Sequence, residues 1–224
     1  MADRDEPRKK LADLLANLFG PPEPPPPMTD LVPRLDAWLR RHRPGFYARL
    51  LPGLSDAEWA DFEAALRLKL PDGFRVLYRW RNGQPDDYFK SFRGNQRWMS
   101  VAEIRGKKQV LDGMIGYDFE PGWWDRNWVP FLHNGGGSHL CVDVAGTDDG
   151  RPGQLVEFWK ADPDRPVVSP SIEHWLHHFV SSLERDRWEE TNIGFECVEL
   201  AGPADDDRLH PESDTGPPVG REEW

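Results

Sequence analysis

The stretch WVPFLHNGGGSHLCVDV, residues 128–144, holds two short apolar runs on either side of a polar, glycine-rich segment. Apolar runs of this length between turn residues are typical of β-strands. We therefore predict that 128–132 and 139–144 pair as a β-hairpin across 133–137. The glycines at 135–137 suit a tight turn or close backbone approach. They do not match a phosphate-binding loop, because neither Gly-Lys-Ser/Thr nor a helix start follows them.

Downstream of this hairpin, the pattern predicts a third strand, a long helix and an edge strand. The third strand is predicted at 154–159, after a turn rich in glycine and aspartate. Residues 193–200 are predicted as the edge strand. The helix begins at Ser171, and its apolar residues recur at intervals of three and four, which places them on one face: Ile172, Trp175, Leu176, Phe179, Val180 and Leu183.

Upstream of the hairpin, apolar residues at helical spacing predict two helices. One begins near Pro71, which a helix tolerates in its first turn, and ends before Gly83. The other begins at Thr29, and its buried face is formed by four residues: Leu31, Leu35, Trp38 and Leu39.

Two more helices are predicted from their first residues. Ser55 with Glu58, and Ser100 with Glu103, both show the capping-box pattern. In a capping box, each of the two side chains satisfies a backbone donor at the helix start.

The chain is predicted to divide into three parts. Residues 1–28 combine an amphipathic helix at 10–19 with a proline-rich linker, because the prolines at 21–27 fix φ and remove backbone donors. The helix either packs back on the domain or serves as a detachable docking segment. Residues 29–200 form the folded domain, and 201–224 form a disordered acidic tail.

Charge and cysteine content narrow the class of partner. The chain has 39 acidic and 28 basic side chains and a formal net charge of −11. Nucleic acid carries charge of the same sign, so we expect no nucleic-acid partner, whereas a basic protein would be attracted.

Two distant cysteines do not make a disulfide framework. The apolar run at 14–16 is too short for a signal sequence or a membrane span, so we expect a cytoplasmic protein without membrane attachment.

The candidate chemical motifs all have simpler interpretations. His174 and His178, with His177 between them, have chelating spacing, but they point away from the apolar face of their helix, and the glutamate of H-E-x-x-H is replaced by tryptophan. The aspartates at 143 and 148–149 lack the ligand pattern of a calcium loop and favour a polar turn. We therefore expect no catalytic residue, no metal and no cofactor.

Two segments are candidates for partner binding. The first is the cluster Trp123, Trp124 and Asp125, where the rings either fill the core or leave at least one tryptophan exposed as an interface anchor.

The second candidate is Asp86, Asp87 and Tyr88, within the run Asp-Asp-Tyr-Phe-Lys that follows the helix stop at Asn82-Gly83. Loops held by a rigid scaffold often carry recognition residues. The hypothesis is that these three residues make acidic and aromatic contacts with a basic partner; the alternative is a solvated loop without function.

In order and spacing, these motifs resemble the SUKH superfamily, which includes cell-wall assembly regulators of the Smi/Knr type and bacterial toxin-immunity proteins. The resemblance covers roughly residues 30–185. It implies an α+β fold with helices packed around a mainly antiparallel sheet, no cofactor, and a surface that binds protein. It rests on Leu70-Pro71, Phe74, Leu77, Tyr78, Asn82-Gly83, Trp128-Val129-Pro130-Phe131, Gly137, Leu140, Asp143 and the helix from Ser171.

Three functional hypotheses follow. The leading one is an immunity protein that neutralises a cognate toxin. The alternative is a regulatory or scaffold protein of the cell-wall assembly regulator type, which recruits a partner through its N-terminal helix. An enzyme acting on carbohydrate is suggested only by abundant tryptophan and scattered carboxylates, and would require two facing carboxylates in one pocket.

Overall fold

The computed structural model describes residues 24–147 and 150–198. The predicted helix at 10–19, the first linker residues at 21–23, the aspartates at 148–149 and the tail at 201–224 lie outside the described residues. The proposed division of the chain into three parts therefore stays a prediction.

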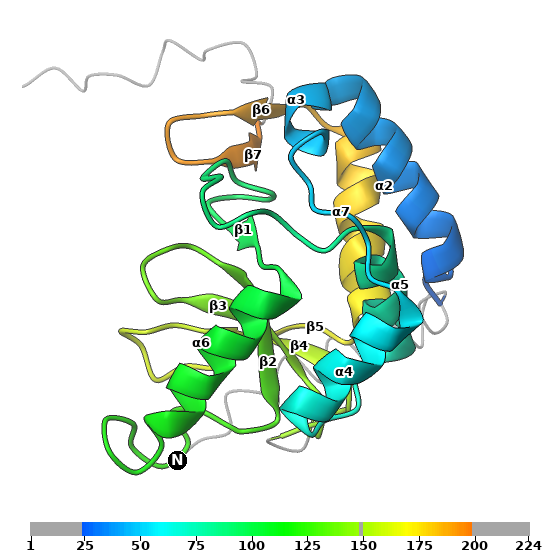
Figure 1. The fold of residues 1–224 in the computed structure, drawn as a ribbon. Helices are drawn as coiled ribbons and strands as arrows, with labels where there is room; N and C mark the ends of the chain where they lie inside the picture. Colours follow the sequence, from blue (N-terminus) through cyan, green and yellow to red (C-terminus); the bar gives the residue numbers. More distant parts are fainter. Residues whose placement is uncertain (1–23, 148–149, 199–224) are drawn as a thin grey trace, which may run out of the picture.

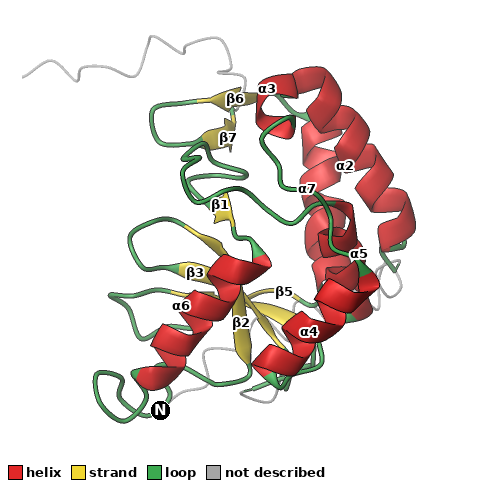
Figure 2. Ribbon diagram, viewed as in Figure 1, coloured by secondary structure: helices red, strands yellow, loops and turns green. Residues whose placement is uncertain are grey.

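The described part is α+β, as expected (Figures 1 and 2). Its helices are α2 (Met28–His42), α3 (Pro44–Tyr47), α4 (Asp56–Leu66), α5 (Asp72–Trp80), α6 (Val101–Gly113) and α7 (Ile172–Arg185). Its strands are β1 (Arg97–Trp98), β2 (Trp128–His133), β3 (His139–Asp143), β4 (Gln154–Phe158), β5 (Val167–Ser169), β6 (Trp188–Glu190) and β7 (Phe195–Cys197).

Strands β1 to β5 form one antiparallel sheet in sequence order, and β6 pairs with β7 in a separate hairpin. The predicted β2–β3 hairpin is confirmed, with Trp128 opposite Asp143 and His133 opposite His139. The register shifts between Pro130 and Leu132. Proline donates no ladder hydrogen bond, and a register irregularity is one of the few places where a central strand accepts it.

The sheet is buried on both faces, because its residues alternate between two apolar cores. One face packs against α5 and α7, where the Phe131 ring meets Phe74 and Trp175 edge-on. This larger core receives Val129, Phe131, Leu140, Val142 and Leu155 from the sheet. The smaller core on the other face contains Leu111, Trp124, Trp128, Cys141, Val156 and Phe158. Burial on both sides explains why the strands read as continuous apolar runs.

Figure 1 shows α2 and α7 side by side along one flank, with α6 crossing in front of the strands. All five predicted helices in the described part are confirmed, as α2, α4, α5, α6 and α7. Four short elements were not predicted: α3, β1, β5 and β6. Each has two to four residues, which is too short to establish a hydrophobic period.

The two predicted capping boxes have different outcomes. At α4 both reciprocal bonds form between Ser55 and Glu58. At α6 the Ser100 hydroxyl accepts a hydrogen bond from the Glu103 amide, but the Glu103 carboxylate binds His133 instead of returning to Ser100. The second capping box is therefore only half formed.

The buried Asp143 organises the turn after β3. Its carboxylate accepts hydrogen bonds from the amides of Ala145, Gly146 and Thr147, from the Thr147 hydroxyl and from the Gln154 amide. Five donors therefore occupy a side chain that has no exposed surface. The polar-turn interpretation of this segment is supported, since the carboxylate serves the local backbone.

We expect the substitution Asp143→Ala to lower the free energy of unfolding by about 3 kcal/mol, because it leaves several buried donors without an acceptor. Urea denaturation of both proteins measures this difference. The matched control is Asp118→Ala, which removes an exposed carboxylate and should change stability by less than about 0.5 kcal/mol. Equal effects of the two substitutions would contradict the assigned role.

Candidate protein-binding surface

A buried glutamine, Gln84, holds the loop between α5 and β1 by hydrogen bonds to its backbone. Gln84 has no exposed surface, and its side-chain amide donates to the carbonyls of Lys90 (2.7 Å) and Tyr88 (3.4 Å). Its Oε1 accepts from the Trp98 amide at 2.8 Å. Gly83, just before it, adopts φ +67°, and an added Cβ would lie 2.4 Å from the Met99 carbonyl oxygen. The loop therefore starts from a position that only glycine fits.

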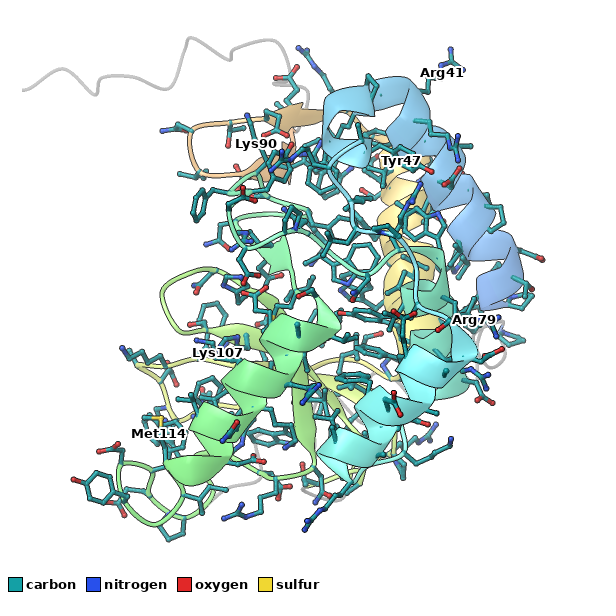
Figure 3. All side chains as sticks on the ribbon, viewed as in Figure 1. Arg41, Tyr47, Arg79, Lys90, Lys107 and Met114 are labelled. Atoms are coloured by element: carbon teal, nitrogen blue, oxygen red, sulfur yellow. The ribbon has the colours of Figure 1, made fainter. Side chains whose placement is uncertain are left out.

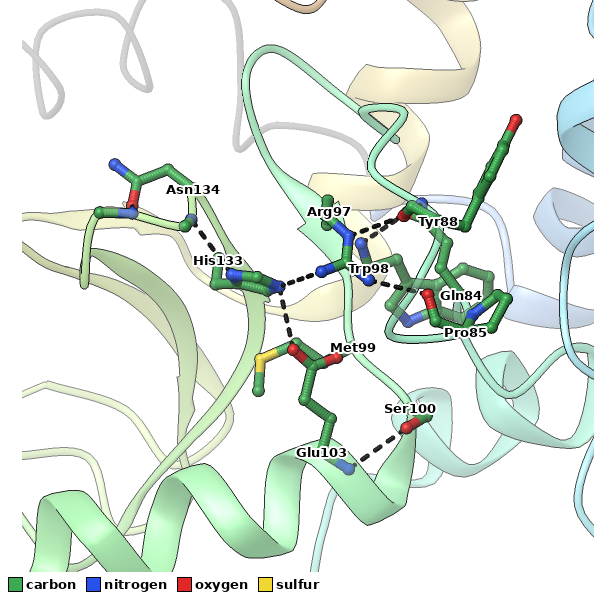
Figure 4. Close-up of polar contacts among 12 residues, drawn as sticks. Gln84, Pro85, Tyr88, Arg97, Trp98, Met99, Ser100, Glu103, His133 and Asn134 are labelled. Atoms are coloured by element: carbon green, nitrogen blue, oxygen red, sulfur yellow. Dashed lines mark hydrogen bonds and ion pairs between the residues drawn. The ribbon is translucent and has the colours of Figure 1, made fainter.

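Arg97 of β1 holds the same loop through its carbonyls (Figure 4). Its Nε donates to Tyr88 O at 2.9 Å and its Nη2 donates to Pro85 O at 2.8 Å. On its other side lies the His133 ring, whose Nε2 is 3.0 Å from the Glu103 carboxylate. His133 Nδ1 accepts from the Gly135 amide at 3.1 Å. One chain of polar contacts thus joins the loop, the β2–β3 turn and α6.

The Glu103 carboxylate is held charged within this chain of contacts. Burial alone would raise its pKa, but the hydrogen bond from His133 and the positive charges of Arg97 and Lys107 outweigh burial and lower the pKa.

The loop 85–90, which Gln84 and Arg97 hold in place, carries acidic and aromatic side chains. Asp86 and Asp87 are exposed, and Asp87 forms an ion pair with Arg49 at 3.2 Å. The half-buried Tyr88 ring packs against Phe46 and beneath the Arg49 guanidinium. Phe89, to which the sequence hypothesis assigned no contact, is 77% exposed. Asp86, Asp87 and Tyr88 are therefore adjacent on a rigid loop, and their role in binding stays a prediction.

Of the two alternatives for the tryptophan cluster, Trp124 follows the one in which the ring fills the core. Trp124 is 5% exposed, belongs to the smaller core and donates from Nε1 to Asp112 at 2.8 Å. The idea that Trp124 is a surface anchor is therefore wrong. Trp123 is half-buried beneath Arg165, and the Asp125 carboxylate accepts two hydrogen bonds from the next-but-one residue, Asn127. These three side chains therefore make their contacts within the domain, and sequence composition alone does not predict such contacts.

The two candidate patches lie at opposite ends of the molecule. In Figure 3, Lys90 marks the loop 85–90 near the β6–β7 hairpin, whereas Met114, which packs on the smaller core beside Trp123, lies at the far end of α6. The two patches are therefore separate surfaces.

The sequence did not predict the cavities of this domain, because the residues that line them are far apart in the chain. A cleft of about 490 Å³ between α4 and α6 is lined by Arg105, Lys108, Asp112 and Arg126 among others. Here Lys108 is already neutralised by Asp112 and also donates to the Arg126 carbonyl.

The second cavity is a groove of about 320 Å³ lined by the turn at 93–96, Glu157, Trp159 and the β6–β7 hairpin. A smaller cavity of about 60 Å³ adjoins it and is lined in part by His139. Burial lowers the pKa of Arg93 and raises the pKa of Glu157, and Arg93 partly opposes the rise at Glu157.

The histidines of α7 do not form a metal site. His174 Nδ1 lies 3.0 Å from the Ser171 hydroxyl at the start of α7, where it extends the cap. Across residues 24–147 and 150–198, no group of three or more His, Cys, Asp or Glu side chains has the arrangement of a metal site. Within the same residues, no helix has the length and apolar character required to cross a membrane.

Comparison with known proteins now identifies the family. The model of the SMI1/KNR4 family (SUKH-1) matches residues 53–178, more than half of the chain. This chain therefore belongs to the SMI1/KNR4 family, and the match runs from the residues before α4 into α7. The loop 85–90 and the Arg97–His133–Glu103 contacts lie inside it, whereas the β6–β7 hairpin lies outside.

Three relatives illustrate the family. The chain is 22% identical to "KNR4/SMI1 homolog 2" of Debaryomyces hansenii, over 76% of this chain and 38% of the relative. It is 24% identical to "Cell wall biosynthesis/cell cycle regulator smi1" of Schizosaccharomyces pombe, over 73% of this chain and 38% of the relative. It is 19% identical to "Cell wall assembly regulator SMI1" of Saccharomyces cerevisiae, over 69% and 40%. The matched regions thus span about two fifths of these relatives.

We expect Arg97→Lys to loosen the loop 85–90, because one ammonium group cannot reproduce the two-pronged hold on the carbonyls of Tyr88 and Pro85. The Tyr88 amide hydrogen, now bonded to Pro85 O at 3.0 Å, should exchange at least about tenfold faster. Hydrogen exchange followed by NMR measures this rate. Arg126→Lys is the matched control, since that guanidinium makes no hydrogen bond within the described residues; equal rates in both variants would contradict the role of Arg97.

His139 should make the fold sensitive to acid. Burial, helped by the charge of Lys107, lowers the pKa of His139 from 6.5 to about 3. The unfolded chain therefore binds this proton more tightly than the folded chain does. The stability of the fold is fully present above pH 6.5, where the ring is neutral in both states, and it decreases as pH falls toward 3. His139→Gln should remove up to about 1.4 kcal/mol per pH unit from the slope of stability against pH in this window. Urea unfolding at several pH values measures that slope, and His178→Gln, which changes an exposed ring, should leave it unaltered.

Proposed function

We propose that this chain is a protein-binding domain with a regulatory or scaffold role of the cell-wall assembly regulator type. The three relatives described above are named as cell-wall regulators or as homologues of them, which supports this hypothesis over the leading one from the sequence. Nothing in the comparisons supports toxin neutralisation. The relatives' names also describe regulators rather than enzymes, in agreement with a role in recognition.

The loop 85–90 is the proposed contact surface, and the observation that carries this proposal is the exposure of Phe89. A large apolar ring gains about 1.5–3 kcal/mol when a partner covers it fully. Gln84 and Arg97 already bind the loop's carbonyls, so little conformational entropy remains to be lost on binding. A rigid aromatic side chain beside charged residues is a common composition of an interface hot spot.

The acidic side chains of the loop complement this aromatic contact. Asp86 makes no ion pair within the described residues, so its charge is available to a basic partner. Together with the net charge of −11, it would increase the association rate with a cationic surface. The proposed partner is therefore a protein with a basic rim around an apolar pocket. A cytoplasmic location for this encounter stays a prediction.

The test is co-purification of the tagged full-length chain from its native cell, with bound proteins identified by mass spectrometry. The substitution Phe89→Ala should weaken the recovered complex by about 2 kcal/mol, or roughly thirtyfold in affinity. Tyr117→Ala is the matched control, because it removes an aromatic ring that is 88% exposed on another loop. Unchanged affinity of Phe89→Ala would contradict the assigned surface.

The identity and salt dependence of the complex separate the remaining hypotheses. Binding that weakens with salt in the parent chain, and less so in the double substitution Asp86→Asn and Asp87→Asn, supports an electrostatic contribution from the loop. Recovery of cell-wall or signalling proteins supports the regulatory role, whereas recovery of a toxin-like polypeptide in near-equal amount would overturn it in favour of immunity.

A further inference from the structure

The groove beside β4 has the composition of a ligand site, and it is separate from the loop 85–90. Its volume of about 320 Å³ lies in the range of small-molecule sites, roughly 300–1,000 Å³. The adjoining cavity of about 60 Å³ shares four lining residues with it, so the two form one continuous depression. The shared residues are Asn95, Gln96, Glu157 and Trp159.

Buried polar atoms in this depression have no partner in the described part of the chain. His139, which lines the smaller cavity, is 3% exposed, and its Nδ1 makes no hydrogen bond there. Arg93 lines the larger groove, and its buried Nε is also without a partner. An unpaired buried polar atom is costly, so such atoms are usually satisfied by water or a ligand.

Asn95, Gln96 and Ser138, which also line the depression, can both donate and accept hydrogen bonds. The side-chain amides of Asn95 and Gln96 make no hydrogen bonds to other described residues, and the Ser138 hydroxyl lines the smaller cavity. An amide offers two donor hydrogens and an acceptor oxygen, and a hydroxyl offers both roles at one atom. Adjacent groups of this kind complement vicinal hydroxyls, each of which also donates and accepts.

One aromatic ring borders both cavities. Trp159 is 44% exposed, and the sequence pattern predicted it as the last residue of the third strand. The strand ends at Phe158, which leaves the Trp159 ring outside the two apolar cores. Its flat, electron-rich face can stack against the polarised C–H bonds on one side of a pyranose ring.

We propose that this depression, the Trp159 groove, binds a neutral sugar unit of an oligosaccharide. Trp159 stacks on the sugar ring, and Asn95, Gln96 and His139 bind its hydroxyl groups. Anionic ligands are disfavoured, since Glu157 and Glu196 line the larger groove opposite a single cation, Arg93. This inference is independent of the proposed function and assigns the domain a second ligand.

The test is isothermal titration calorimetry of the full chain with neutral hexasaccharides at millimolar concentration. The probes are the β-1,3-linked and β-1,4-linked glucose hexamers and the β-1,4-linked N-acetylglucosamine hexamer. At least one hexamer should bind, and Trp159→Ala should weaken it by at least about tenfold. Gln96→Ala should weaken the same hexamer less, because neighbouring groups can still bind the sugar hydroxyls.

Tyr117→Ala is again the control for loss of an exposed aromatic ring, and it should bind the hexamer as the parent chain does. Circular dichroism and thermal melting establish that Trp159→Ala folds, which its partial exposure leads us to expect. The inference is overturned if none of the hexamers binds, if binding is equal in Trp159→Ala, or if the groove instead accepts only peptides in chemical-shift mapping.

Discussion

Burial of the central sheet on both faces is the constraint on which the rest of this structure depends. Because β2 and β3 contribute side chains alternately to two cores, a one-residue slip would exchange their contents and place Trp128 against α7. Register is therefore strongly specified. The buried Asp143 fixes the turn that ends β3, and the shift at Pro130 accommodates a residue without an amide hydrogen.

The surfaces available for recognition lie where this buried sheet ends. β1 has only two residues, yet Arg97 anchors the loop 85–90 and the Trp98 amide donates to Gln84 Oε1. Just before β1, the turn at 93–96 forms a wall of the Trp159 groove. The loop proposed to bind protein and the polar groove thus both adjoin the same short edge strand of the sheet.

Sequence reasoning recovered the elements whose signals are local and missed the contacts that depend on tertiary structure. The hairpin, the helices and the family resemblance follow from apolar periodicity, caps and turn residues. The loop at 86–88 was identified from composition, but the anchoring of its carbonyls by Gln84 and Arg97 was not. For Trp123 and Trp124 the sequence left both a core and a surface position open, because composition alone cannot distinguish a buried indole from an exposed one. Ser100 and Glu103 matched a capping box, yet the Glu103 carboxylate binds His133, thirty residues away in the chain, and not the Ser100 amide.

The β6–β7 hairpin closes one side of the Trp159 groove but lies beyond the region that defines the family. Of the hairpin residues that line the groove, Trp188 packs on the larger core, whereas Glu196 and Cys197 belong to neither core. Substitutions at these two positions therefore change one wall of the groove without removing an apolar contact from the domain.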